Sequence, residues 1–147
     1  MNRKWSITVV EHDPMLGMLL QEVLSDEGYV TELWIECEGA LECIRRTQPD
    51  LVILDLWLRR RGDGWQVVGH LQHDPATRQI PIILCTDDTL LLQMEGAQLV
   101  EWAAAVLEKP FELDRLLTLI NQALKEEAKE PERVISHAEQ PALLVGT

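Results

Sequence analysis

Five short apolar runs, each followed by a segment with apolar residues at helical spacing, constrain the fold more than any other feature of this chain. The runs expected to be strands cover about 6–10, 29–35, 51–56, 80–86 and 104–107. The segments expected to be helices cover about 14–27, 38–46, 65–72, 90–101 and 113–125. Nearly continuous apolar strands that alternate with helices are typical of a parallel sheet covered on both faces. The pattern therefore predicts an α/β fold of three layers.

The first helix has the clearest start and end signals. Asp13 is suited to cap it, Pro14 fits its first position, and Gly28 fits its end. The apolar stripe that should face the sheet is expected to be Leu16, Leu19, Leu20, Val23 and Leu24.

Length and composition indicate one domain with a tail. The chain has 147 residues, of which 46% are hydrophobic, and this is ample for a packed core. From about residue 126 the sequence becomes polar. We therefore expect residues 1–125 to form the domain. Residues 126–147 should be a C-terminal helix extension that frays into a flexible tail.

Charge and cysteine content narrow the classes of partner and compartment. With 13 basic and 25 acidic residues the formal net charge is −12, so the chain gains no affinity for nucleic acid from counterion release. No segment approaches 18 consecutive apolar residues, so we expect no membrane span. Cys37, Cys43 and Cys85 show neither a paired framework nor a metal-ligand spacing. This usage suits a reducing compartment, and we expect a cytoplasmic protein.

Chemically capable side chains follow four of the five expected strands. Because the carboxyl ends of parallel strands meet at one edge of a sheet, these side chains should converge. They could together form a pocket for a divalent metal and for a phosphoryl group carried by Asp55. The residues are Glu11, His12 and Asp13 after the first strand, Asp55 after the third, Thr86 after the fourth, and Lys109 after the fifth.

These motifs, in this order, resemble the receiver domain of two-component response regulators, over about Ile7 to Leu124. The matching pieces are the acidic turn after the first strand, the sequence Pro-Asp-Leu-Val-Ile-Leu-Asp ending at Asp55, Asp63-Gly64, Ile80-Pro81-Ile82 leading to Thr86, and Lys109-Pro110-Phe111. The resemblance implies a flavodoxin-like (βα)5 fold with a parallel five-stranded sheet in the order 2-1-3-4-5. It also implies that a histidine kinase or a phosphotransfer protein phosphorylates Asp55 with the help of Mg²⁺, as in a phosphorelay.

The resemblance also assigns roles to individual residues. Glu11, Asp55 and the backbone carbonyl of Trp57 would hold the magnesium ion. Thr86 would donate its hydroxyl to a phosphoryl oxygen, and Lys109 would place its ammonium group beside another. A cis peptide bond between Lys109 and Pro110 would fix the direction of the lysine.

The chain departs from the family pattern at several positions. His12 stands where a second acid is usual, and Asp13 lies one position too far and is better placed as a helix cap. The loop with Arg59–Arg61 after the third strand lacks the usual proline. Asp87 follows Thr86 where a small residue is usual, and Val106 replaces the switch aromatic of the fifth strand. Because imidazole is a poor magnesium ligand, we expect weak Mg²⁺ binding, with Mn²⁺ as a possible substitute.

Three function classes follow from these residues. The leading hypothesis is a phosphorylation-controlled signalling module, not an enzyme, that binds a downstream protein as a monomer or a weak homodimer. Its only catalysis would be self-catalysed phosphotransfer and autodephosphorylation. The alternative is a degenerate receiver that binds proteins without phosphorylation, which His12 and Asp87 favour. A phosphatase with an aspartyl nucleophile is disfavoured, because such chemistry commonly needs a second acid where Trp57 stands.

Overall fold

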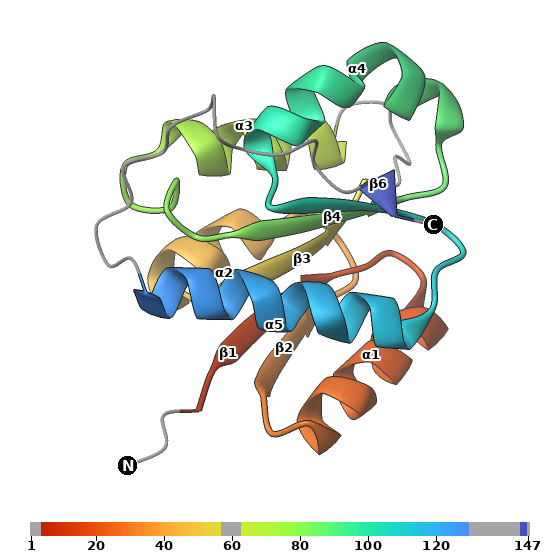
Figure 1. Ribbon diagram of the computed structural model, residues 1–147. Coiled ribbons are helices and arrows are strands. Elements are labelled where there is room, and N and C mark those ends of the chain that lie inside the picture. Colours follow the sequence, from red (N-terminus) through yellow and green to blue (C-terminus); the bar gives the residue numbers. More distant parts are fainter. Residues whose placement is uncertain (1–3, 57–62, 130–144, 147) are drawn as a thin grey trace.

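The structure is a computed structural model that describes residues 4–56, 63–129 and 145–146. Strands and helices alternate along the chain (Figure 1). The strands are β1 (Ser6–Val10), β2 (Val30–Trp34), β3 (Leu51–Asp55), β4 (Ile82–Thr86), β5 (Ala105–Glu108) and β6 (Val145–Gly146). The helices are α1 (Pro14–Asp26), α2 (Ala40–Thr47), α3 (Asp63–His73), α4 (Thr89–Trp102) and α5 (Leu113–Lys129). No helix among the described residues is long and apolar enough to cross a membrane.

The strands form one parallel sheet in the order β2-β1-β3-β4-β5-β6. The predicted flavodoxin-like order 2-1-3-4-5 is therefore confirmed. The sixth strand, β6, was not predicted: its two residues pair with Val106 and Leu107 at the edge of β5. Residues 145–146 thus extend the sheet from within the segment that was expected to be a tail.

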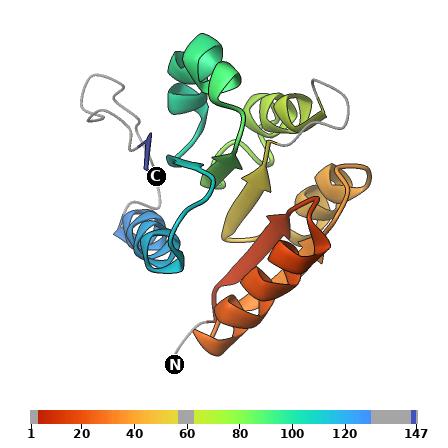
Figure 2. The same cartoon turned by 90° about the vertical axis from the view of Figure 1, so that its right-hand side faces the viewer.

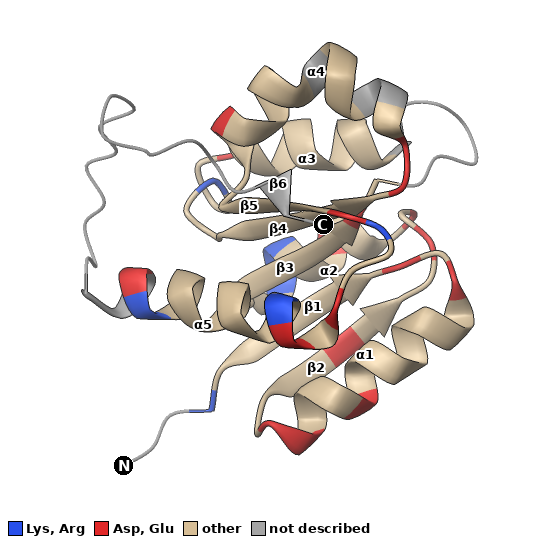
Figure 3. Ribbon diagram, turned by 45° about the vertical axis from the view of Figure 1, so that its right-hand side comes forward, with Lys and Arg blue, Asp and Glu red and all other residues tan. Residues whose placement is uncertain are grey.

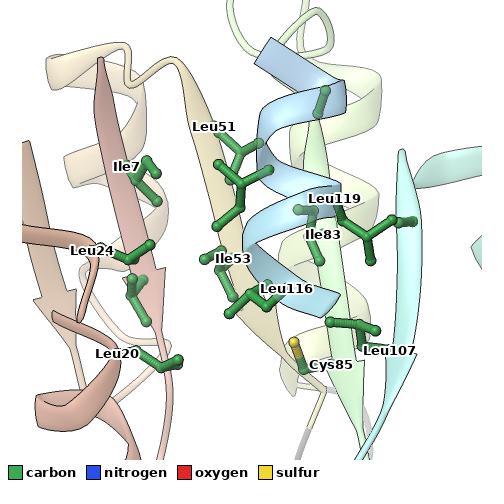
Figure 4. Packing of buried hydrophobic residues seen from close by; sticks show 14 of the residues in the cluster. Ile7, Leu20, Leu24, Leu51, Ile53, Ile83, Cys85, Leu107, Leu116 and Leu119 are labelled. Carbon is green, nitrogen blue, oxygen red and sulfur yellow. The ribbon is translucent and has the colours of Figure 1, made fainter. Parts of the chain in front are cut away.

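Two apolar clusters fill the space between the sheet and the helices on its two faces (Figures 1 and 2). Helices α1 and α5 pack on one face, where Leu20 and Leu116 meet Ile7 and Ile53 (Figure 4). Helices α2, α3 and α4 pack on the other face. Successive strand side chains point to opposite faces, so β1, β3, β4 and β5 contribute buried residues to both clusters. The near-continuous apolar runs are explained by this burial on both faces.

Helix α1 begins as predicted, and Leu16, Leu20 and Leu24 of the predicted stripe pack against the core. The Asp13 carboxylate accepts hydrogen bonds from the backbone N–H groups of Met15 at 3.0 Å and Leu16 at 3.5 Å. The prediction that Leu19 faces the core is wrong, because that side chain is 45% exposed. The buried positions are Gly17, Leu20 and Leu24. A Cβ at Gly17 would lie 2.8 Å from a Leu33 methyl group, so the missing side chain lets α1 approach β2 on that face.

Candidate functional site

Backbone pairing brings the ends of β1, β3, β4 and β5 to one edge of the sheet. Val10 pairs with Leu54, which places the following residues, Glu11 and Asp55, at neighbouring strand ends. The N–H of Glu11 donates to the carbonyl of Trp34 at 2.8 Å, and the N–H of Lys109 donates to the carbonyl of Thr86 at 2.8 Å. Figure 3 shows charged residues where loops leave the carboxyl ends of the strands. Backbone hydrogen bonds therefore hold the predicted site residues together at one edge of the sheet.

Lys109 joins two buried carboxylates at this edge. Glu11 is 2% exposed and Asp55 is 4% exposed, so both carboxylates are almost completely removed from water. Lys109 Nζ lies 2.8 Å from Glu11 Oε1 and 3.2 Å from Asp55 Oδ1. The peptide bond between Lys109 and Pro110 is cis, as the resemblance implied. One ammonium group thus offsets part of the cost of burying two negative charges.

His12 contacts the same two carboxylates from a different direction. Its Nδ1 atom is in hydrogen-bonding contact with Asp55 Oδ2 and lies 3.2 Å from Glu11 Oε2. Glu11 Oε2 also accepts a hydrogen bond of 3.1 Å from the N–H of Asp13. His12 therefore faces the oxygen of each carboxylate that Lys109 does not contact.

Three charged groups shift one another's pKa values: Glu11, Asp55 and Lys109. Burial raises the pKa of Glu11, and the hydrogen bond with Asp55 raises it further, while Lys109 acts against the rise. Burial opposes the shift at Asp55, but the hydrogen bond with Glu11 and the charge of Lys109 outweigh it and lower the pKa of that carboxyl. Burial also opposes the shift at Lys109, yet its contacts with Glu11 and Asp55 raise its pKa. Asp55 is therefore the carboxylate that stays ionised most readily.

Thr86 is buried at the end of β4, and its Oγ1 accepts a hydrogen bond of 3.0 Å from the N–H of Asp88. This bond lies just before α4, which begins at Thr89. A hydroxyl that accepts one bond can still donate its own hydrogen to another acceptor. The proposed contact between Thr86 and a phosphoryl group is therefore compatible with this geometry.

The other residues that the sequence predicted for the site are Asp13, Asp87, Val106 and Trp57. Asp13 serves as the cap of α1, and Asp87 is exposed beyond the end of β4. Val106 is buried between the sheet and the helices and pairs with Leu84, so its side chain belongs to the core. Trp57, predicted to offer its carbonyl to a metal, lies outside the described residues, as does the loop with Arg59–Arg61.

Gly64 adds a structural requirement that the motif alone did not reveal. A Cβ at this position would lie 3.2 Å from the backbone oxygen of Asp55 and 3.2 Å from the Cα of Leu56. The first turn of α3 therefore packs directly on the backbone that carries the central carboxylate. The sequence signal was the glycine in Asp63-Gly64, whose role in close packing becomes visible only in three dimensions.

The donor set fits a divalent cation. Glu11, His12 and Asp55 each offer one ligand atom, and these atoms all lie within 4.8 Å of one another. Two carboxylate oxygens are suitable ligands for Mg²⁺, whereas the imidazole nitrogen is better suited to transition metals. Chemically, the site combines an ionised carboxylate, an ammonium group and a place for a cation, which together suit the transfer of a phosphoryl group.

Comparison with known proteins gives a consistent result. The family model described as "Response regulator receiver domain" matches residues 7–121. The chain is 32% identical over 123 residues to Protein Rrf1 of Nitratidesulfovibrio vulgaris, covering 84% of this chain and 85% of that relative. It is 28% identical over 142 residues to the nitrogen assimilation regulatory protein NtrX of Azorhizobium caulinodans, covering 95% of this chain. The chain spans only 31% of the length of that NtrX protein.

A solved structure shows the same architecture. The crystal structure of a putative response regulator from Chloroflexus aurantiacus is 26% identical and superposes with a TM-score of 0.71. The match covers 84% of this chain and 99% of that one.

Proposed function

Because the chain belongs to the response regulator receiver domain family, we propose that it accepts a phosphoryl group on Asp55 from a histidine kinase or a phosphotransfer protein. The observation that carries the proposal is the contact of Lys109 Nζ with both buried carboxylates, at 2.8 Å to Glu11 and 3.2 Å to Asp55. Receiver domains are signalling domains, and the phosphorylated state would act by binding a downstream protein.

The chemistry uses the ionised form of Asp55. A carboxylate oxygen of Asp55 forms a bond to phosphorus as the bond between phosphorus and the donor's histidine nitrogen breaks. The proton needed by the released imidazole comes from solvent. Lys109 places a positive charge beside Asp55, where the oxygens of the incoming phosphoryl group add negative charge. The lowered pKa of Asp55 keeps the attacking carboxylate unprotonated at neutral pH.

A divalent ion, Mg²⁺ in the family pattern and Mn²⁺ as a substitute, would neutralise charge between the carboxylate and the phosphoryl oxygens. Glu11, Asp55 and His12 would hold it, together with the carbonyl of Trp57. Thr86 would hydrogen-bond another phosphoryl oxygen. Asp13, Asp87 and Val106 would affect the site indirectly, through helix capping, local charge and core packing.

Partners and compartment are also proposals. The formal net charge of −12 favours protein partners over nucleic acid, and we propose a monomer or a weak homodimer. Among the described residues Cys37, Cys43 and Cys85 form no disulfide bond, which suits a cytoplasmic location. We further propose that residues 1–125 form the receiver domain and that 126–147 extend it.

A second candidate function is a phosphorylation-independent receiver. His12 favours it, because this residue stands where the family pattern has a second acid. Incubation with acetyl phosphate and Mg²⁺ or Mn²⁺, followed by intact mass measurement, separates the two. Our proposal predicts one added phosphoryl group on the wild type and none on Asp55→Asn. An unmodified wild type at high donor concentration, with either metal, would favour the phosphorylation-independent receiver.

A further inference from the structure

We infer that the site formed by Glu11, His12 and Asp55 selects first-row transition ions such as Co²⁺ and Zn²⁺ over Mg²⁺, with His12 as the residue that determines the selectivity. The inference rests on the proposed function, since it concerns the metal of the same phosphorylation site. It differs from a merely weakened magnesium site, because it assigns the imidazole a positive role as a ligand.

The first observation is the direction of the imidazole. His12 Nδ1 contacts Asp55 Oδ2 and lies 3.2 Å from Glu11 Oε2, so the nitrogen is turned into the cluster and not toward solvent. The side chain as a whole is 32% exposed, so His12 lies at the solvent edge of the cluster. A ring turned outward would have contributed nothing to a metal site.

The second observation is that Lys109 and His12 contact different oxygens of the same two carboxylates. Lys109 occupies the Oε1 atom of Glu11 and the Oδ1 atom of Asp55. His12 faces the other oxygen of each carboxylate, Oε2 and Oδ2. A cation on the His12 side therefore leaves both contacts of Lys109 intact. It would gain one nitrogen and two oxygen ligands from residues at the ends of two paired strands.

The third step is the chemistry of that donor set. The family pattern would supply three carboxylates, whereas this chain supplies two and an imidazole, beside one ammonium group. Magnesium binding depends mainly on charge and on oxygen ligands, so Mg²⁺ loses affinity here. Co²⁺ and Zn²⁺ accept imidazole readily and rank above Mn²⁺ for mixed nitrogen and oxygen sites. Substitution of one ligand type therefore changes selectivity as well as affinity.

The test compares Co²⁺ and Mg²⁺ binding to the full chain. Co²⁺ binding is followed by its visible absorption, and Mg²⁺ binding by competition with Co²⁺. The wild type should bind Co²⁺ at least about a hundredfold more tightly than Mg²⁺, and His12→Asp should lower that ratio by about tenfold or more. His70→Asp is the matched control: it makes the same substitution at an exposed histidine of α3 and should leave the ratio unchanged. Circular dichroism establishes that each variant is folded.

A second readout identifies the ligand atom directly. Pulsed electron paramagnetic resonance of bound Mn²⁺ should show coupling to an imidazole nitrogen in the wild type and in His70→Asp, and none in His12→Asp. An unchanged Co²⁺ to Mg²⁺ ratio in His12→Asp, or no nitrogen coupling in the wild type, would overturn the inference.

Phosphorylation by acetyl phosphate distinguishes failure of this inference from failure of the proposed function. If Asp55 is modified with Mg²⁺ while the ratio of Co²⁺ to Mg²⁺ affinity does not change in His12→Asp, the inference about selectivity is wrong and the proposed function is supported. If Co²⁺ binds through His12 but Asp55 is never modified, the proposed function is wrong and the inference about the metal site is supported.

Discussion

Lys109 Nζ lies 2.8 Å from Glu11 Oε1, although 98 positions separate the two residues in the sequence. The contact exists because both residues follow strands of one parallel sheet and because the backbone N–H of Lys109 is tied to Thr86. It places a positive charge between two buried carboxylates, and together with the hydrogen bond from Glu11 this charge lowers the pKa of Asp55. The functional proposal depends on this arrangement.

The raised pKa of Glu11 predicts a pH dependence of stability. The folded state holds the Glu11 proton more tightly than the unfolded state does, so stability falls as pH rises from about the unfolded value of 4.5 through the raised folded value. Glu11→Gln should flatten this part of the profile. The measurement is urea unfolding between pH 4.5 and neutral pH, with a chelator present.

The control for this prediction is Glu42→Gln, at a side chain that is 77% exposed. It should keep the wild-type profile, because its carboxylate is hydrated in both states. If Glu11→Gln loses as much stability over the same pH range as the wild type, Glu11 does not carry the dependence.

Gly64→Ala should destabilise the protein and disturb the site. Its new Cβ would lie 3.2 Å from backbone atoms of Asp55 and Leu56, which cannot move without moving β3. We expect a cost of about 1–3 kcal/mol in the free energy of unfolding. Gly96→Ala, in α4, meets nothing within 4 Å and should stabilise the helix by roughly 0.5–1 kcal/mol. Equal effects of both substitutions would show that close packing at Gly64 is unimportant.

The resemblance to receiver domains was sufficient to predict the sheet order. The polar residues at the ends of the apolar runs were sufficient to predict the convergence on Asp55, because the carboxyl ends of parallel strands meet at one edge of the sheet. The sequence could not predict where every element begins. Strand β4 begins at Ile82 and not at Ile80, since the N–H of Ile80 closes a turn to Thr77 and Pro81 has no N–H to donate. Helix α2 begins at Ala40, after Gly39 with its left-handed backbone.

Side-chain direction was the harder problem. Apolar spacing alone placed Leu19 in the core, but Gly17 is buried instead, at a position where a Cβ would lie 2.8 Å from Leu33. The sequence likewise could not show that His12 turns toward Asp55, because a side chain beyond a strand end is oriented by tertiary contacts.

Deletion of residues 130–147 should leave the domain folded. The buried residues of both core clusters lie between Ile7 and Leu124, so only the pairing of β6 with β5 is lost from the described residues. We expect the free energy of unfolding to change by less than about 1 kcal/mol. A chain ended at Thr118 loses buried Leu119, Ile120 and Leu124 and should not fold. A large loss of stability in the shorter deletion would place residues 130–147 inside the cooperative unit.

Phosphorylation should alter α4 more than any other element. Thr86 Oγ1 accepts the N–H of Asp88 just before α4, so a phosphoryl group that recruits this hydroxyl would perturb the first turn. Val106 is buried and has no ring to reorient, so the response should travel through the backbone near 86–101. Hydrogen exchange with and without beryllofluoride should differ most in that range. Equal exchange in both states across 86–101 would contradict the prediction.

The most direct test of the central claim is the identity of the phosphorylated residue. After treatment with acetyl phosphate and a divalent metal, borohydride reduces an aspartyl phosphate to homoserine, which peptide mass analysis can locate. The account predicts homoserine at position 55 alone in the wild type, and none in Asp55→Asn. Homoserine at another acid, or none at position 55 in a fully phosphorylated sample, would contradict the account.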